Sequence, residues 1–124
     1  MSNKRPTNLN LLTIRFPITA IVSILHRVSG FLLFLAIPVF LMVMTLTLQS
    51  PEAFFTVKVC FEHPLIKLLL IGFLGALFYH LFAGIRHLFM DAGVADTLKS
   101  ARLTSGWVIV STIILTSLMG IYLW

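Results

Sequence analysis

Residues 68–85, LLLIGFLGALFYHLFAGI, form an apolar run without a charged side chain, and His80 contributes the one imidazole in it. As an α-helix this run is long enough to lie within the hydrocarbon core of a bilayer. Helical spacing places four residues on one stripe of that helix: His80, Gly84, His87 and Asp91. A histidine inside a membrane is unfavourable unless it has a partner, so His80 marks a candidate functional site.

Two interpretations account for the small residues around His80. Four positions recur at intervals of four residues along the run: Gly72, Ala76, His80 and Gly84. Small residues beside a histidine allow a flat ring system to approach the helix backbone, and the partner of His80 is then a metal, in membranes most often haem iron. The alternative is a helix–helix contact between small residues, which explains the glycines but not the imidazole.

The composition identifies an integral membrane protein. Hydrophobic residues make up 59% of the 124 residues and charged residues only 10%, whereas soluble domains average about 25% charged residues. The net charge of +5 comes from basic residues that flank apolar runs, which indicates membrane orientation and phospholipid contact rather than nucleic-acid binding. Because Cys60 is the single cysteine, an internal disulfide and cysteine-based zinc or iron–sulfur sites are excluded.

The hydropathy pattern predicts an all-α membrane protein with three transmembrane helices, at about 28–48, 66–88 and 103–124. The first of these runs is uncharged and corresponds to about 31 Å of helix, and we expect Pro38 to kink it. Residues 1–16 are expected to form a cytoplasmic N-terminal arm, and residues 17–124 a single transmembrane domain.

A short amphipathic helix is predicted in front of the first span, with Pro17 at its start. One face of this helix is apolar, and the other carries Ser23, His26 and Arg27. That polar face is either a solvated surface at the membrane interface or a pocket below the headgroups. In the second case a hydroxyl, an imidazole and a guanidinium converge on one ligand.

The basic residues are distributed unevenly along the chain. Four of them precede the first predicted span: Lys4, Arg5, Arg15 and Arg27. Two lie in the first loop, three in the second loop and none after the last span, so the positive-inside rule places the N-terminus in the cytoplasm and Trp124 outside. His80 then lies about 9 Å deeper in the membrane than Arg86. A cofactor beside His80 would have cationic groups above it, at the depth of acidic propionates or a polar quinone head.

Two stretches of the chain resemble known signatures. Arg5-Pro6 followed by residues 23–29, SILHRVS, and residues 80–93, HLFAGIRHLFMDAG, match in order those of the cytochrome b556 membrane-anchor subunits of bacterial succinate dehydrogenase. The three predicted spans and the total length of the chain match this family as well, so the resemblance covers nearly the whole chain. It implies a haem b shared with a second hydrophobic anchor subunit, within a multi-subunit helical bundle. It also implies an iron–sulfur subunit and a flavoprotein subunit as partners, ubiquinone as substrate, and location in the bacterial inner membrane with a periplasmic C-terminus.

The resemblance implies specific roles around the haem. His80 falls on the position of an axial haem iron ligand, and the companion anchor subunit supplies the second axial histidine. His26 and Arg27 would lie near the haem propionates. His87 is about 10 Å from His80 along the helix, too far to ligate the same iron, so it would serve a propionate or face an interface.

The resemblance also implies a site for ubiquinone. Ser23 and Arg27 fall on ubiquinone-site positions, and Asp91 falls on a position that shapes this site or its proton supply. The flavoprotein oxidises succinate, and the iron–sulfur subunit passes the electrons to ubiquinone at the cytoplasmic membrane face. Ser23 is expected to hydrogen-bond a quinone carbonyl, and Arg27 to stabilise negative charge on the quinone as it is reduced.

Three alternatives have to be considered, and the sequence disfavours the third. The same family includes anchors of quinol:fumarate reductases, and the sequence does not fix the direction of catalysis. A structural helical anchor without a redox role is the second alternative. The third, a small multidrug-type transporter, requires a carboxylate within a span, and none of the three apolar runs contains one. His63 and Cys60, between the first two predicted spans, are assigned no function.

Overall fold

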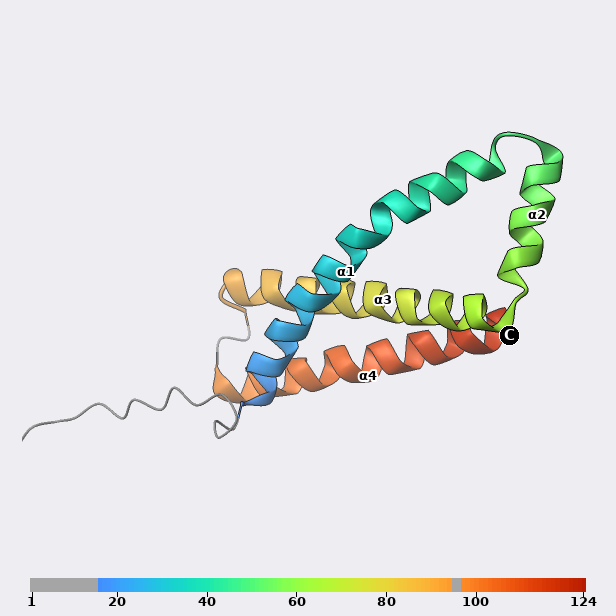
Figure 1. Ribbon diagram of the computed structural model, residues 1–124. Helices are drawn as coiled ribbons and strands as arrows, with labels where there is room; N and C mark the ends of the chain where they lie inside the picture. The colour runs from blue at the N-terminus through green and yellow to red at the C-terminus, as the bar shows by residue number, and fades with distance from the viewer. Residues whose placement is uncertain (1–15, 95–96) are drawn as a thin grey trace, which may run out of the picture.

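A computed structural model describes residues 16–94 and 97–124, and these ranges are almost entirely helical. The helices are α1 (Ile18–Thr47), α2 (Pro51–Phe61), α3 (Pro64–Asp91) and α4 (Leu98–Leu123), as Figure 1 shows. Three of them, α1, α3 and α4, are long and apolar enough to cross a membrane. The prediction of an all-α membrane protein with three spans is therefore confirmed. Except for Phe16, the predicted N-terminal arm lies outside the described residues.

Helix α1 contains both the predicted amphipathic segment and the predicted first span. It continues without a break from Ile18 to Thr47, so residues 17–27 do not form a separate short helix. The reason is local, because no proline lies between Pro17 and Pro38 to interrupt the backbone hydrogen bonds where the amphipathic segment meets the span. Pro38 lies inside the helix, and the path of α1 bends part-way along its length in Figure 1.

The segment predicted to be a loop between the first two spans contains helix α2. Ser50 caps this helix, because its hydroxyl accepts a hydrogen bond from the Ala53 amide at 3.1 Å, and Pro51 occupies the first helical position. The loop prediction relied on the charged residues that interrupt the apolar runs. Such residues mark where a membrane span ends, but they do not end helical structure.

Helices α3 and α4 both begin earlier than the predicted spans because side chains cap them ahead of the apolar residues. His63 Nδ1 accepts a hydrogen bond from the Leu65 amide at 3.3 Å, so His63 has a structural position at the start of α3. Thr97 Oγ1 accepts from the Ser100 amide at 3.3 Å at the start of α4. Hydropathy locates only the part of a helix that fits the hydrocarbon, and these caps lie beyond it.

The three long helices meet at the end of the molecule where α1 begins, α3 ends and α4 begins. Helices α3 and α4 lie side by side, and the first half of α1 crosses them there (Figure 1). Val22, Ala83 and Val108, one from each helix, form the buried cluster at this crossing. The second half of α1 diverges, and α2 leads back to the start of α3. Most large apolar side chains remain exposed, such as Phe31 at 62%, which suits contact with lipid or with a further helix.

Candidate functional site

Three imidazoles meet where α1 crosses α3. The rings of His26 from α1 and His80 from α3 stack, with centroids 4.2 Å apart and planes 11° apart. The His87 ring also approaches His26, with its centroid 5.0 Å from that of His26 and the planes inclined by 53°. The structure therefore brings together His26, His80 and His87 of the predicted site. All three side chains are half-buried.

The His80 ring is held by α1 through its Nδ1 atom. This nitrogen lies 3.1 Å from the backbone carbonyl oxygen of His26 and 3.2 Å from Ser29 Oγ. The Ser29 hydroxyl in turn donates to the same His26 carbonyl at 2.9 Å, and Ser29 is buried.

The contact with the His26 carbonyl favours one tautomer of His80. A carbonyl oxygen only accepts, so this contact is a hydrogen bond when Nδ1 carries the proton. The neutral imidazole then carries its proton on Nδ1 and its lone pair on Nε2. Residues 16–94 and 97–124 offer Nε2 no hydrogen-bond partner. In this tautomer His80 therefore has a free lone pair on Nε2, which could bind a metal ion.

Two glycines make the close approach of these rings possible. At Gly30, a Cβ atom would lie 2.8 Å from Cε1 of His80, which is closer than real Cβ contacts, and 3.3 Å from Nδ1, which is a tight contact. At Gly84, a Cβ atom would lie 3.3 Å from Nε2 of His26. The small residue one turn after His80 was predicted to admit a flat ring system, and in the structure the imidazole of His26 lies beside it. Gly72, two turns before His80, has open space around it.

Ser23, Arg27 and Asp91 lie at the margin of this histidine cluster. Ser23 is half-buried, whereas Arg27 and Asp91 are exposed. Ser23 and Arg27 are one turn apart on α1, on the side next to the stripe that faces α3, and Asp91 is the last residue of α3. No side-chain hydrogen bond or ion pair joins any of the three to another described residue. The structure thus leaves Ser23 and Arg27 together at the surface of the bundle and does not bring Asp91 into contact with them.

Several residues of the site have no role in the sequence-based prediction. Ser29 and Gly30 follow His26 by three and four residues, so their position on the same face was available from helical spacing. The hydroxyl of Tyr79 donates to the Val22 carbonyl at 2.9 Å and fixes α3 against α1. Arg86 is buried against α4, with only 5% of its surface exposed, and spacing alone gives no sign of that burial.

Comparison with known proteins identifies consistent relatives. Residues 1–119 match the family model described as succinate dehydrogenase/fumarate reductase transmembrane subunit. The succinate dehydrogenase cytochrome b556 subunit of Coxiella burnetii is 39% identical over 125 residues, covering 100% of both chains. The subunits of the same name from Rickettsia felis and Paracoccus denitrificans are 35% and 34% identical, over 96% and 92% of this chain and 93% and 88% of theirs.

Proposed function

The chain belongs to the family of succinate dehydrogenase/fumarate reductase transmembrane subunits, and from this premise we propose that it is an anchor of a succinate:ubiquinone oxidoreductase. In this proposal it contributes one axial ligand to a haem b and part of the site at which ubiquinone is reduced. Membership of the family confirms the resemblance inferred from the two motifs. The observation that carries the haem assignment is the geometry of His80, whose Nδ1 is held by α1 while Nε2 has no partner among the described residues.

The ring nitrogens of His80 suit a haem iron that takes one histidine ligand from each of two chains. Histidines that bind metals usually donate their other ring N–H to a carbonyl or carboxylate, as Nδ1 of His80 does toward His26. Within residues 16–94 and 97–124, no three His, Cys, Asp or Glu side chains converge as a complete metal site. Among the clustered imidazoles, His80 is the one whose Nδ1 is held by α1, and in this proposal a companion anchor subunit supplies the second axial histidine.

The histidine cluster has a distinct task for each member. His80 would hold the iron through Nε2, while the hydrogen bonds from Nδ1 set the angle of the ring and increase its basicity as a ligand. His26 lies beside both His80 and His87, toward the end of the bundle where cationic side chains collect, and His26, His87 and Arg27 would face the haem propionates. A b-type haem, when bound, supplies a centre that accepts and returns single electrons.

Ser23 and Arg27 are proposed to line the ubiquinone site. They share one side of α1, near the end of the bundle where α4 begins, and Arg27 is exposed and so accessible to a ligand and to a soluble partner. The Ser23 hydroxyl can donate to a quinone carbonyl oxygen. The Arg27 guanidinium can stabilise the negative charge that develops on that oxygen as electrons arrive, an effect that is strongest where water is excluded. Asp91, exposed at the end of α3, is proposed to influence proton delivery to this site.

The distribution of charge supports the proposed orientation. Among the described residues, the end of the bundle with the histidine cluster carries Arg27, Arg86, Lys99 and Arg102 against Asp91. The opposite end carries Lys58 and Lys67 against Glu52 and Glu62, and Lys67 and Glu62 pair at 2.9 Å. By the positive-inside rule the first end faces the cytoplasm. This is the side on which we propose that an iron–sulfur subunit and a flavoprotein subunit dock, in a bacterial inner membrane with the C-terminus in the periplasm.

Two alternatives are less well supported. The family description covers fumarate reductases as well, but the relatives from Coxiella burnetii, Rickettsia felis and Paracoccus denitrificans are named as succinate dehydrogenase subunits. A structural anchor without a redox role leaves His80 unexplained. Packing alone does not require a polar ring nitrogen without a partner among apolar side chains, which is an unfavourable arrangement.

The test of this proposal is expression of the subunit with and without its companion anchor. Since His80 supplies one ligand, we expect the isolated chain to bind no low-spin haem b, and co-expression to restore the low-spin visible spectrum. The spectra of oxidised and dithionite-reduced preparations measure this directly. A complete low-spin spectrum from the isolated chain would contradict the shared-haem proposal.

A further inference from the structure

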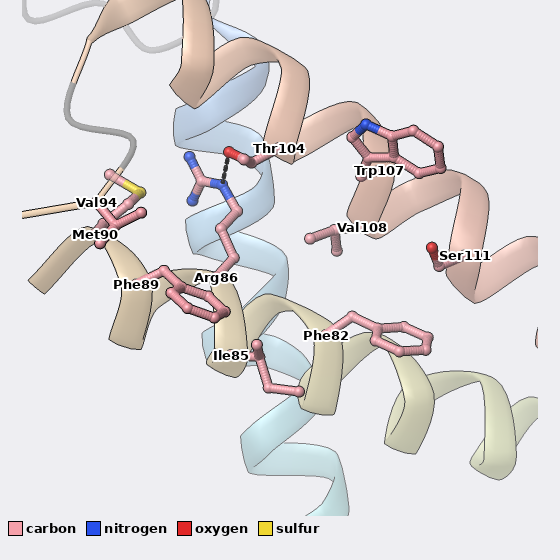
Figure 2. A pocket seen from close by; sticks show the side chains of 10 residues that line it. All are labelled: Phe82, Ile85, Arg86, Phe89, Met90, Val94, Thr104, Trp107, Val108 and Ser111. Atoms are coloured by element: carbon pink, nitrogen blue, oxygen red, sulfur yellow. Dashed lines mark hydrogen bonds between the residues drawn. The ribbon is translucent and has the colours of Figure 1, made fainter. Parts of the chain in front are cut away.

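A cavity lies between α3 and α4. It has a volume of about 400 Å³ and is lined mainly by apolar side chains, among them Phe82, Ile85, Phe89, Trp107 and Val108. Figure 2 shows the Arg86 guanidinium extending from α3 toward Thr104 of α4, with Phe89 on one side and Val108 and Trp107 on the other. A single cationic group thus lies at the head of an apolar cavity.

The hydrogen bonds of Arg86 leave its charge without a counter-ion among the described residues. Its Nε donates to Thr104 Oγ1 at 3.2 Å and its Nη2 donates to the Ala101 carbonyl at 3.3 Å. Both acceptors are neutral. Nη1 is buried and makes no hydrogen bond to any residue in the described ranges. No carboxylate in these ranges lies within ion-pair distance of the guanidinium, although only 5% of Arg86 is exposed.

An unpaired buried cation is energetically unfavourable, and more so in a membrane. Arginine keeps its proton, so it cannot relieve the penalty by becoming neutral. An anion beside the guanidinium would reduce the penalty. The apolar walls require that the rest of the same ligand be apolar, so the cavity fits an amphiphile with a negatively charged head.

The position of Arg86 along α3 matches the depth of lipid headgroups. Asp91 ends the helix five residues later, which is about 7.5 Å along the axis. Lys99 and Arg102 lie at the start of α4, at this same end of the molecule. Acidic phospholipids collect at the leaflet that faces such a basic end.

We propose that the Arg86 cavity binds an acidic phospholipid, with the lipid phosphate beside the guanidinium of Arg86 and acyl-chain carbon against the apolar walls. A guanidinium is well suited to this role because its planar donors match the geometry of phosphate oxygens. The bound lipid would fill the space between α3 and α4 and hold them together where Ala101 and Ser105 are buried. The proposal does not depend on the haem or ubiquinone assignments.

The experiment is lipid titration of the purified membrane assembly, followed by native mass spectrometry. The wild-type protein is compared with Arg86→Gln, which keeps a polar side chain but removes the charge. Arg102→Gln is the matched control, because Arg102 is an exposed cation at the same end of the bundle. We expect at least about tenfold weaker binding of phosphatidylglycerol by Arg86→Gln, since it loses a hydrogen bond between charged groups. Arg102→Gln should change binding by less than about twofold, and Arg86→Lys should lie between.

Three results would overturn the proposal. The first is unchanged phosphatidylglycerol binding in an assembled Arg86→Gln protein. The second is loss of a companion subunit from that variant with lipid binding intact, which would show that a protein carboxylate is the counter-ion. The third is equal binding of phosphatidylglycerol and phosphatidylcholine by the wild-type protein, a comparison that serves even if Arg86→Gln fails to assemble. Saturable binding of one phosphatidylglycerol per chain, in preference to phosphatidylcholine, would support the site.

Discussion

Replacing Gly30 with alanine tests whether the close contact between α1 and His80 is required for the site. The added Cβ would lie 2.8 Å from Cε1 of His80, whereas ordinary contacts begin at 3.4 Å, so the ring has to retreat by the difference, 0.6 Å. The atoms that hold Nδ1 are also on α1, at 3.1 Å and 3.2 Å. A ring pushed directly away from α1 would therefore exceed hydrogen-bonding distance to both the His26 carbonyl and Ser29 Oγ.

The free-energy consequence of Gly30→Ala has two opposing parts. Forcing a methyl group into a packed contact is destabilising by about 1–3 kcal/mol, while alanine stabilises a helix by up to about 1 kcal/mol relative to glycine. The net loss of stability should be about 0–3 kcal/mol. The displacement of the proposed iron ligand should nevertheless be large enough to alter haem binding.

The assay is the haem content and reduced visible spectrum of the purified assembly, with its thermal unfolding measured in parallel. We expect Gly30→Ala to lower haem occupancy or shift the low-spin bands while the subunits stay assembled. Gly72→Ala is the matched control, because it makes the same change in a membrane helix where nothing lies within 4 Å of the new Cβ. Equal spectra for the two variants would refute the reasoning that Gly30 determines the position of His80.

Two further predictions concern α1. Ser23→Ala and Arg27→Leu should each reduce succinate–quinone turnover roughly ten- to a hundredfold, the effect of losing a hydrogen bond to a charged or charging group. Succinate oxidation by a dye that takes electrons before they reach the membrane should be unaffected. Arg27→Lys should restore quinone turnover only in part. Equal loss of the quinone-linked and dye-linked rates would indicate an assembly role instead. Ser29→Ala should leave the haem bound, because the His26 carbonyl still accepts from His80. It should shift the haem midpoint potential by on the order of tens of millivolts, which a redox titration measures, whereas Ser29→Thr should keep the potential near that of the wild type.

The spans were predictable because charge and hydropathy report directly on what a bilayer accepts. The stripe His80, Gly84 and His87 was predictable as well, since helical spacing fixes which residues share a face and all three lie beside His26 in the structure. Helix boundaries were less predictable. Caps such as Ser50 and Thr97 act through single hydrogen bonds outside the apolar runs, so hydropathy does not register them.

The environment of Arg86 could not be predicted from the sequence. A charged residue at the end of an apolar run normally indicates the membrane surface. Its burial depends instead on α4, where Ala101 and Ser105 allow the two helices to approach and enclose the guanidinium. The hydrogen bonds of His80 also depend on helix pairing, because Ser29 and His80 are 51 residues apart in the chain.

The central claim is that His80 is an axial haem ligand, and His80→Leu tests it most directly. The measurement is the reduced-minus-oxidised visible spectrum of the assembled complex, with haem content determined on the same preparation. We predict that the low-spin b-type signal disappears or shifts, while the quinone site, on the flank of α1, retains part of its turnover. A variant that keeps the wild-type spectrum and haem content would contradict the claim and leave His80 as a packing residue.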